Sequence, residues 1–318
     1  MTISLASNRA SIAFIGVALV FLLGTLLIPG FASLFSLRAM LILASLLAIA
    51  ALGQTLVMIL GGIDLSIPFV IGFANVVFAS LYGSGMPAIA AMLIVIVLAA
   101  GIGAASGALS AGLSIHPLIV TLGIGTVVQA AVQIWTGGLP TGSAPPFIND
   151  FVSLGGTIGP LPFPWVIPFT LLLTIGCFFV LRRTVYGRRL YALGSNLRAA
   201  ELALVRPVAM WMTTFALSAV FAAVAGILLL GFTGSSSATV GAPYLFQTVA
   251  AVVIGGTALV GGRGGFVGTV AGAIVLVELR TLLIGLGLSE ALVQSALGVL
   301  ILALVAAYGR DQHIRNLI

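Results

Sequence analysis

Residues 87–112 read PAIAAMLIVIVLAAGIGAASGALSAG, a stretch without one charged side chain. It lies inside a longer run, residues 65–149, in which Asp, Glu, Lys and Arg are all absent. That run is several times longer than the roughly 20 apolar residues that one transmembrane helix needs. The whole chain is 61% hydrophobic and 6% charged, whereas soluble domains are about 25% charged. The sequence therefore predicts an all-α integral membrane protein that crosses the bilayer several times.

Glycine and proline residues divide the chain into about ten apolar segments. They lie at about 11–28, 40–60, 66–82, 87–112, 117–137, 164–182, 207–231, 246–260, 266–285 and 291–308. The first segment follows Arg9 but precedes no clear cleavage pattern of small residues, so we expect a retained helix rather than a signal peptide. We predict one transmembrane domain over residues 1–318, a polytopic bundle of about ten helices. Ten crossings place both termini on the same side of the membrane.

The arginines indicate which side that is. Half of the twelve basic residues lie in residues 182–206, together with one acidic residue. Loops rich in Arg or Lys tend to stay in the cytoplasm, so we assign residues 182–206 and both termini to the cytoplasmic side. The proline-rich residues 138–163 then form the longest external loop. A nucleic-acid-binding protein spreads basic charge over one face, so we expect no nucleic-acid partner here.

Residues 182–206 contain one predicted short helix, at residues 197–204. Asn196 is a favourable N-cap for this helix, and Pro207 stops the chain from continuing it. A short helix that lies on the cytoplasmic face and is ringed by arginines can bind the anionic headgroups of membrane lipids. It can also dock into a soluble partner and transmit movement to the membrane helices. The sequence leaves both interpretations open.

The composition excludes several kinds of chemistry. The chain has no lysine and therefore no P-loop, whose lysine binds the phosphates of ATP. It also lacks paired carboxylates, clustered histidines and a Cys–His pair, so we expect no catalytic residue and no metal site. Cys177 is the one cysteine, which leaves no intramolecular disulfide to form.

Glycines spaced by four residues predict close helix contacts, because small residues on one stripe let backbones approach in lipid. Two sets have this spacing: Gly103 with Gly107, and Gly264 with Gly268 and Gly272. The first set overlaps the short pattern Gly101-Ile102-Gly103. A dinucleotide-binding loop would need a preceding strand, which an apolar membrane segment does not supply.

Polar residues inside the apolar segments are the candidates for a solute path or gate, because polar groups at membrane depth usually have a function. Asp64 follows a glycine-rich break, where it either shapes a gate or is a solvated carboxylate at the membrane boundary. Glu278 lies deep in the segment 266–285. The other candidates are the amides Asn75, Gln129, Gln133 and Gln247. Amides also bond one membrane helix to another, so both roles stay open for each of them.

Four blocks of the sequence resemble, in the same order, the ribose-type monosaccharide permeases of ATP-binding-cassette (ABC) importers. They are residues 61–66 (GGIDLS), 117–123 (PLIVTLG), 186–200 (YGRRLYALGSNLRAA) and 250–265 (AAVVIGGTALVGGRGG), the last followed by Gly268 and Thr269. The resemblance covers roughly residues 40–308. The chain departs from the family pattern at Ile67-Pro68, Ser110-Ala111, His116 and Leu197. These departures leave the identity of the solute open.

The resemblance implies a permease subunit of the bacterial inner membrane that carries a small sugar or related polyol. It implies three protein partners: a cytoplasmic ABC ATPase that uses ATP and Mg, a periplasmic sugar-binding protein, and a second permease chain that is identical or paralogous. No cofactor is implied for the permease itself. The resemblance assigns coupling to the ATPase to Gly187, Arg188, Arg189, Asn196, Leu197, Arg198, Ala199, Ala200, Glu201 and Leu204. The alternative is an ion-coupled secondary transporter of a small neutral solute.

Overall fold

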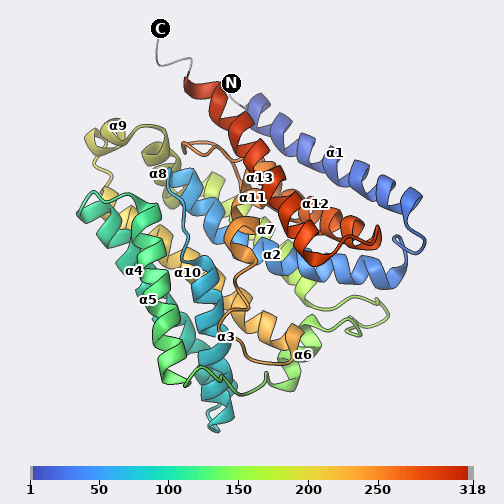
Figure 1. Ribbon diagram of the computed structural model, residues 1–318. Helices are drawn as coiled ribbons and strands as arrows, with labels where there is room; N and C mark the ends of the chain where they lie inside the picture. Colours follow the sequence, from blue (N-terminus) through green and yellow to red (C-terminus); the bar gives the residue numbers. More distant parts are fainter. Residues whose placement is uncertain (1–2, 314–318) are drawn as a thin grey trace.

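The computed structural model describes residues 3–313, which form helices joined by loops and contain no β-strand. In chain order the helices are α1 (Ile3–Leu27), α2 (Leu34–Leu60), α3 (Ile67–Gly83), α4 (Ala88–Gly112), α5 (Pro117–Trp135), α6 (Pro146–Val152), α7 (Val166–Arg183), α8 (Val185–Ser195), α9 (Leu197–Leu202), α10 (Pro207–Thr233), α11 (Tyr244–Ile254), α12 (Phe266–Gly285) and α13 (Glu290–His313). The predicted all-α fold is confirmed. Figure 1 shows α8 and α9 at one end of the bundle and α6 at the other.

Among residues 3–313, six helices are long and apolar enough to cross a membrane: α2, α4, α5, α7, α10 and α12. Within the described residues, four shorter apolar helices accompany them: Ser11–Leu27, Ile67–Gly83, Tyr244–Ile254 and Glu290–Leu300. Each of the ten predicted segments therefore contains one apolar helix. By length and composition the protein crosses the membrane several times, and six of its helices meet the full length of a span.

The predicted segment 246–260 is longer than the helix that it contains. α11 ends at Ile254, because Gly255 and Gly256 follow and Gly256 has a left-handed φ of 85°. The 11 residues of α11 rise by about 16 Å, roughly half the thickness of a bilayer's hydrocarbon core. Residues 255–265 form a glycine-rich loop that leads into α12.

α2 is the central helix of the bundle. Its residues 44–60 are all buried, and α7, α8, α10, α11 and α12 pack around it. Apolar side chains occur on every face of α2, which is typical of a helix surrounded by protein. Gly61 ends the helix with a left-handed φ of 96°. The break that follows, residues 61–66, separates α2 from α3.

Glycines bring two pairs of helices into backbone contact. A Cβ atom on Gly103 would overlap the carbonyl oxygen of Phe215 in α10, and one on Gly107 would lie 2.5 Å from that of Trp211. In the same way, Gly268 and Gly272 of α12 face the backbone of α11. Such contacts are the reason that small residues recur on helix stripes in membranes.

The predicted stripe does not extend to Gly264. This residue lies in the loop before α12, with φ 135°, and a Cβ atom there would overlap the side chain of Thr257. Gly264 is needed for this loop, whose conformation residues with a side chain rarely adopt. Its spacing of four from Gly268 is therefore not a helical spacing.

Both long loops contain helices that sequence rules do not predict. Residues 138–163 include α6, whose Ile148 is buried against Gly231 of α10. Residues 182–206 form α8 as well as the predicted short helix, and that helix, α9, ends at Leu202. Sequence rules miss α8 because it contains two glycines, which have low helix propensity.

Candidate functional site

α8 leaves α7 through a sharp corner. The Oγ1 atom of Thr184 caps α8 by accepting a hydrogen bond from the N–H of Gly187 at 3.3 Å. A Cβ atom on Gly187 would overlap the carbonyl oxygen of Leu181, so the corner requires glycine. Arg188 and Arg189 follow directly and are exposed. Gly187 thus shapes the loop, whereas the two arginines are available to another molecule.

Two tyrosines fasten α8 to the bundle. The hydroxyl of Tyr186 lies 3.0 Å from Oγ1 of Thr214 in α10. The hydroxyl of Tyr191 donates to the carbonyl oxygen of Gly264 at 2.7 Å. Burial raises the pKa of Tyr191 to about 12, so the hydroxyl keeps its proton and remains a donor. α8 is therefore held by specific bonds as well as by its buried Leu190.

α9 begins with the predicted N-cap. Oδ1 of Asn196 accepts from the N–H of Ala199 at 3.1 Å, which satisfies one of the free donors at the helix start. Arg198 and Glu201 are exposed, as expected of residues that meet a partner. Ala200 is 3% exposed, so it packs against the rest of this chain and is not part of the exposed face.

Three leucines, two in α9 and one just after it, form an exposed apolar face. Leu197 is 49% exposed, Leu202 87% and Leu204 88%. Leu204 also has a left-handed φ of 60°, a conformation that costs a residue with a side chain about 1–2 kcal/mol. Glycine and asparagine are the usual residues at this position after a helix. An exposed leucine in a strained conformation is not explained by the packing of this chain.

Asp64 lies in the break between α2 and α3, with 1% of its surface exposed. Ser66 donates to Oδ1 of Asp64 through its N–H, at 2.9 Å, and through its hydroxyl. Ser218 of α10 donates its hydroxyl to Oδ2 at 2.7 Å. The side-chain oxygen of Gln54 accepts from the N–H of Asp64 at 3.2 Å. A solvated carboxylate is therefore the wrong interpretation: Asp64 joins α2, α3 and α10.

Asp64 is the one sequence-based path candidate in this cluster, and Gln54 and Ser66 lie near it in the sequence. The other two residues are Ser218 and Thr121, whose Oγ1 accepts from the N–H of Leu65 at 3.0 Å. Each is a hydroxyl in an otherwise apolar helix, a weak signal because serine and threonine usually bond to their own helix there. We call Gln54, Asp64, Ser66, Thr121 and Ser218 the Asp64 cluster.

A cavity of about 460 Å³ lies at the opposite end, between the end of α5 and residues 236–239. Gln133 lines it, and the hydroxyl of Ser236 is buried beside it without a hydrogen-bond partner in the described part of the chain. A smaller cavity of about 160 Å³ shares Thr239 with it and contains Gln129. All residues that line the two cavities are uncharged. We call the two together the α5 cavity.

Asn75 does not line the α5 cavity. It is fully buried in α3, its Nδ2 donates to the carbonyl oxygen of Gly226 at 3.1 Å, and its Oδ1 accepts from the N–H of Ser237 at 2.8 Å. Because both ends of the amide bond to backbone, Asn75 holds residues 236–239 against the bundle. These bonds give Asn75 a structural role, and its place on a solute path stays a prediction.

Gln247 and Glu278 lie in another part of the bundle. Gln247 lines a cavity of about 220 Å³ between α2, α10, α11 and α12. Glu278 is 5% exposed, does not line this cavity, and has an Oε2 atom without a hydrogen-bond partner among the described residues. Of the six predicted path residues, Gln129 and Gln133 are therefore the two that line adjoining cavities.

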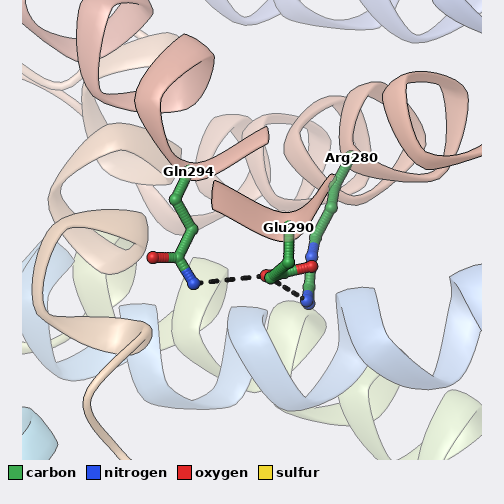
Figure 2. A network of polar contacts seen from close by, with 3 residues as sticks. All are labelled: Arg280, Glu290 and Gln294. Atoms are coloured by element: carbon green, nitrogen blue, oxygen red, sulfur yellow. Dashed lines mark hydrogen bonds and ion pairs between the residues drawn. The ribbon is translucent and has the colours of Figure 1, made fainter. Parts of the chain in front are cut away.

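Figure 2 shows how Arg280, which also lines the cavity of Gln247, is held. Its Nη2 donates to Oε1 of Glu290 at 2.8 Å, and Nε2 of Gln294 donates to the same oxygen at 3.3 Å. The side chains of Arg280 and Glu290 are 37% and 49% exposed, and exposed pairs contribute about 0–1 kcal/mol. The contact fixes the start of α13 to α12 rather than forming a site.

Comparison with known proteins gives a consistent result. Residues 36–306 match the model of the family described as "Branched-chain amino acid transport system / permease component". The chain is 32% identical to the ribose import permease protein RbsC of Escherichia coli, over 82% of each chain. It is 31% identical to the fructose import permease protein FrcC of Rhizobium meliloti, over 92% of this chain and 82% of the relative.

A third relative, the probable ABC transporter permease protein YphD of Escherichia coli, is 33% identical over 92% of this chain and 86% of its own. No solved structure matches the chain.

Proposed function

The chain belongs to the family of branched-chain amino acid transport system permease components, and we propose from this premise that it translocates a small sugar or related polyol. It is a multi-pass permease subunit of an ABC importer in the inner membrane. The observation that carries the proposal is the match over 82% or more of the chain to import permeases for ribose and fructose. No comparison favours the ion-coupled alternative.

The exposed face of α9 supports docking of a cytoplasmic ATPase. Apolar residues exposed to water are stabilised when a partner covers them, and Leu202 and Leu204 are almost fully exposed. The strain at Leu204 is explained if this leucine enters a groove on the partner. Arg188, Arg189 and Arg198 surround the face and fit an acidic rim. In this proposal ATP and Mg bind to the ATPase, and hydrolysis takes place there.

The α5 cavity supports entry of a neutral solute with several hydroxyl groups. Its polar groups are amides and hydroxyls, which both donate and accept hydrogen bonds, and its lining has no charge that would select an ion. The unpaired hydroxyl of Ser236 gains a partner when such a solute binds. A periplasmic binding protein delivers the solute to this end.

The arrangement in the membrane follows from the same proposal. In this proposal the six long and four shorter apolar helices make ten crossings, the short α11 together with the loop that follows it. Both termini and α8–α9 lie in the cytoplasm, in agreement with the arginines there. α4, α5 and α7 expose large apolar side chains such as Val97, Val127 and Leu172. Lipid covers part of this surface, and a second permease chain, identical or paralogous, covers the rest.

Reconstitution into liposomes tests the proposal. The permease alone is expected to hydrolyse no ATP and to accumulate no radiolabelled ribose or fructose. Uptake is expected to appear when the cognate ATPase, Mg-ATP and the binding protein are added together. Uptake by the permease alone, driven by an imposed proton or sodium gradient, would support the ion-coupled alternative and contradict the proposal.

A further inference from the structure

Three segments of backbone meet directly where α8 contacts the bundle. They are the end of α2, the end of α8 and the loop between α11 and α12. The N–H of Gly262 donates to the carbonyl oxygen of Ile59 at 2.8 Å. A Cβ atom on Gly194 would overlap that same oxygen and lie 2.7 Å from the nitrogen of Gly262. A Cβ atom on Gly261 would lie 2.9 Å from the Cα atom of Gly61.

We call Gly61, Gly194, Gly261 and Gly262 the glycine junction. Most of these approaches are between main-chain atoms, and the side chain of Ser195 adds one, since its Oγ atom would lie 2.5 Å from a Cβ atom on Gly262. A contact between side chains can absorb a small displacement by rotating to another conformer. Backbone atoms at van der Waals distance have no such freedom, and close-packed interiors transmit strain. A movement of α8 therefore becomes a movement of the end of α2.

α8 is also fixed to the bundle by side chains on its own side of the glycine junction. The hydroxyl of Tyr191 donates to the carbonyl oxygen of Gly264, in the same loop as Gly262. Leu190 and Leu193 are buried, which seats the helix on the bundle. α9 follows α8 after the single residue Asn196. A displacement of α9 therefore moves α8 at Gly194, because no long loop lies between the two helices to absorb it.

The break after α2 connects the glycine junction to the Asp64 cluster. Asp64 follows Gly61 by three residues, a reach of about 11 Å at most. Its carboxylate is held by Ser66 and by Ser218 of α10, and Thr121 of α5 holds the neighbouring N–H of Leu65. A displacement of the end of α2 thus changes bonds that reach α3, α5 and α10.

We propose that the glycine junction passes movement of α8 to the Asp64 cluster, and that Gly194 is a positioning residue for coupling. This inference rests on the proposed docking of an ATPase at α8–α9. It assigns a task to glycines that bind neither ATP nor solute. It also explains why residue 194 is glycine, since any Cβ atom there would separate α8 from α2.

The test measures solute imported per ATP hydrolysed in proteoliposomes that contain the permease, the cognate ATPase and the binding protein. Gly194→Ala keeps a helical residue in α8 but must move the backbone by about 1 Å to admit the methyl group. We expect ATP hydrolysis to remain within about twofold of wild type, and the import ratio to fall about fivefold or more, a usual size for coupling between sites.

The matched control is Gly176→Ala in α7, where a Cβ atom would meet nothing within 4 Å; its import ratio should equal that of the wild type. A Gly194→Ala complex with an unchanged ratio overturns the inference, even if less complex assembles. If Gly194→Ala does not assemble, Tyr191→Phe decides, because it removes only the bond to Gly264; a wild-type ratio there overturns the inference too. A wild-type complex that does not import contradicts instead the proposed function.

Discussion

Ser218 donates one of the hydrogen bonds that hold the buried carboxylate of Asp64. Replacing this serine by alanine leaves Oδ2 of Asp64 buried without that donor. An unsatisfied buried acceptor costs about 1–3 kcal/mol, and more when it is charged. We predict that Ser218→Ala lowers the free energy of unfolding by at least that amount. The measurement is the melting temperature of the purified protein in detergent, which should be lower than that of the wild type.

Ser106→Ala in α4 is the control for this prediction. Ser106 is also fully buried, but its hydroxyl bonds only to the carbonyl oxygen of Ile102 in its own helix. That oxygen keeps its helical partner when the hydroxyl is removed, so the thermal transition should hardly move. Equal transitions for the two variants would show that the bond between Ser218 and Asp64 contributes nothing measurable.

At the scale of single elements, α9 carries the exposed leucines and α8 carries Arg188, so apolar and basic contributions can be separated. Buried interface anchors commonly cost about 2 kcal/mol or more when truncated, whereas charges at the rim cost less and are screened by salt. We predict that Leu202→Ala and Leu197→Ala reduce retention of the ATPase in a pull-down at both low and high salt. Arg188→Ala should reduce it only mildly, and less at high salt, where the charge of Arg188 is already screened.

Binding of lipid headgroups by α9 predicts the opposite order. In that case removal of Arg188 disturbs membrane placement, and Leu202→Ala leaves ATPase retention unchanged. Ala200→Glu does not distinguish docking of an ATPase from binding of lipid. Ala200 is 3% exposed, so a glutamate there disrupts the packing of α9 against its own chain. The exposed leucines are the informative positions.

The crossing of α4 and α10 depends on which face of α4 a glycine occupies. Gly103 faces the carbonyl oxygen of Phe215, whereas a Cβ atom on Gly101 would meet nothing within 4 Å. Alanine is favoured over glycine inside a helix by about 0.5–1 kcal/mol. We predict that Gly101→Ala leaves thermal stability unchanged or raises it, and that Gly103→Ala lowers it. A higher melting temperature for Gly103→Ala would mean that the two helices can separate at no cost.

The sequence predicts correctly those structural features that depend on interactions between residues close together in the chain. The apolar segments, the N-cap at Asn196 and the break after Gly61 all depend on residues next to one another, and all are found. Asn75 and Gly264 could not be assigned in this way. Their roles depend on contacts with Ser237 and Thr257, and no spacing rule indicates which distant or looped segment will be the neighbour.

The same reason limits prediction of the candidate site. The amides Gln129 and Gln133 lie one helical turn apart in α5, so their places in adjoining cavities follow from helical spacing. Gln247 lies on α11, which faces a different cavity, and the sequence does not say how α11 is rotated. Asp64 is recognisable as a candidate, but its partner Ser218 is 154 residues away.

For the molecule as a whole, the solute-binding end and the ATPase-binding end are separate sites. The α5 cavity and α9 lie at opposite ends of the bundle. We predict that Gln129→Ala lowers uptake while ATPase retention in a pull-down stays at the wild-type level. Leu202→Ala should reduce both, since import without a docked ATPase does not occur. Loss of ATPase retention in Gln129→Ala would contradict the separation of the two ends.

The half-length helix α11 has a consequence for how the protein is made. A segment of 11 residues followed by a glycine-rich loop is poorly suited to enter lipid alone, because the loop's backbone groups need internal partners there. One such partner is the carbonyl oxygen of Ile59 in α2, and another face of α11 is covered by α12. We therefore expect α11 to reach its final position in the membrane only after α12 has been synthesised. It then packs between α12 and α2, which was inserted much earlier.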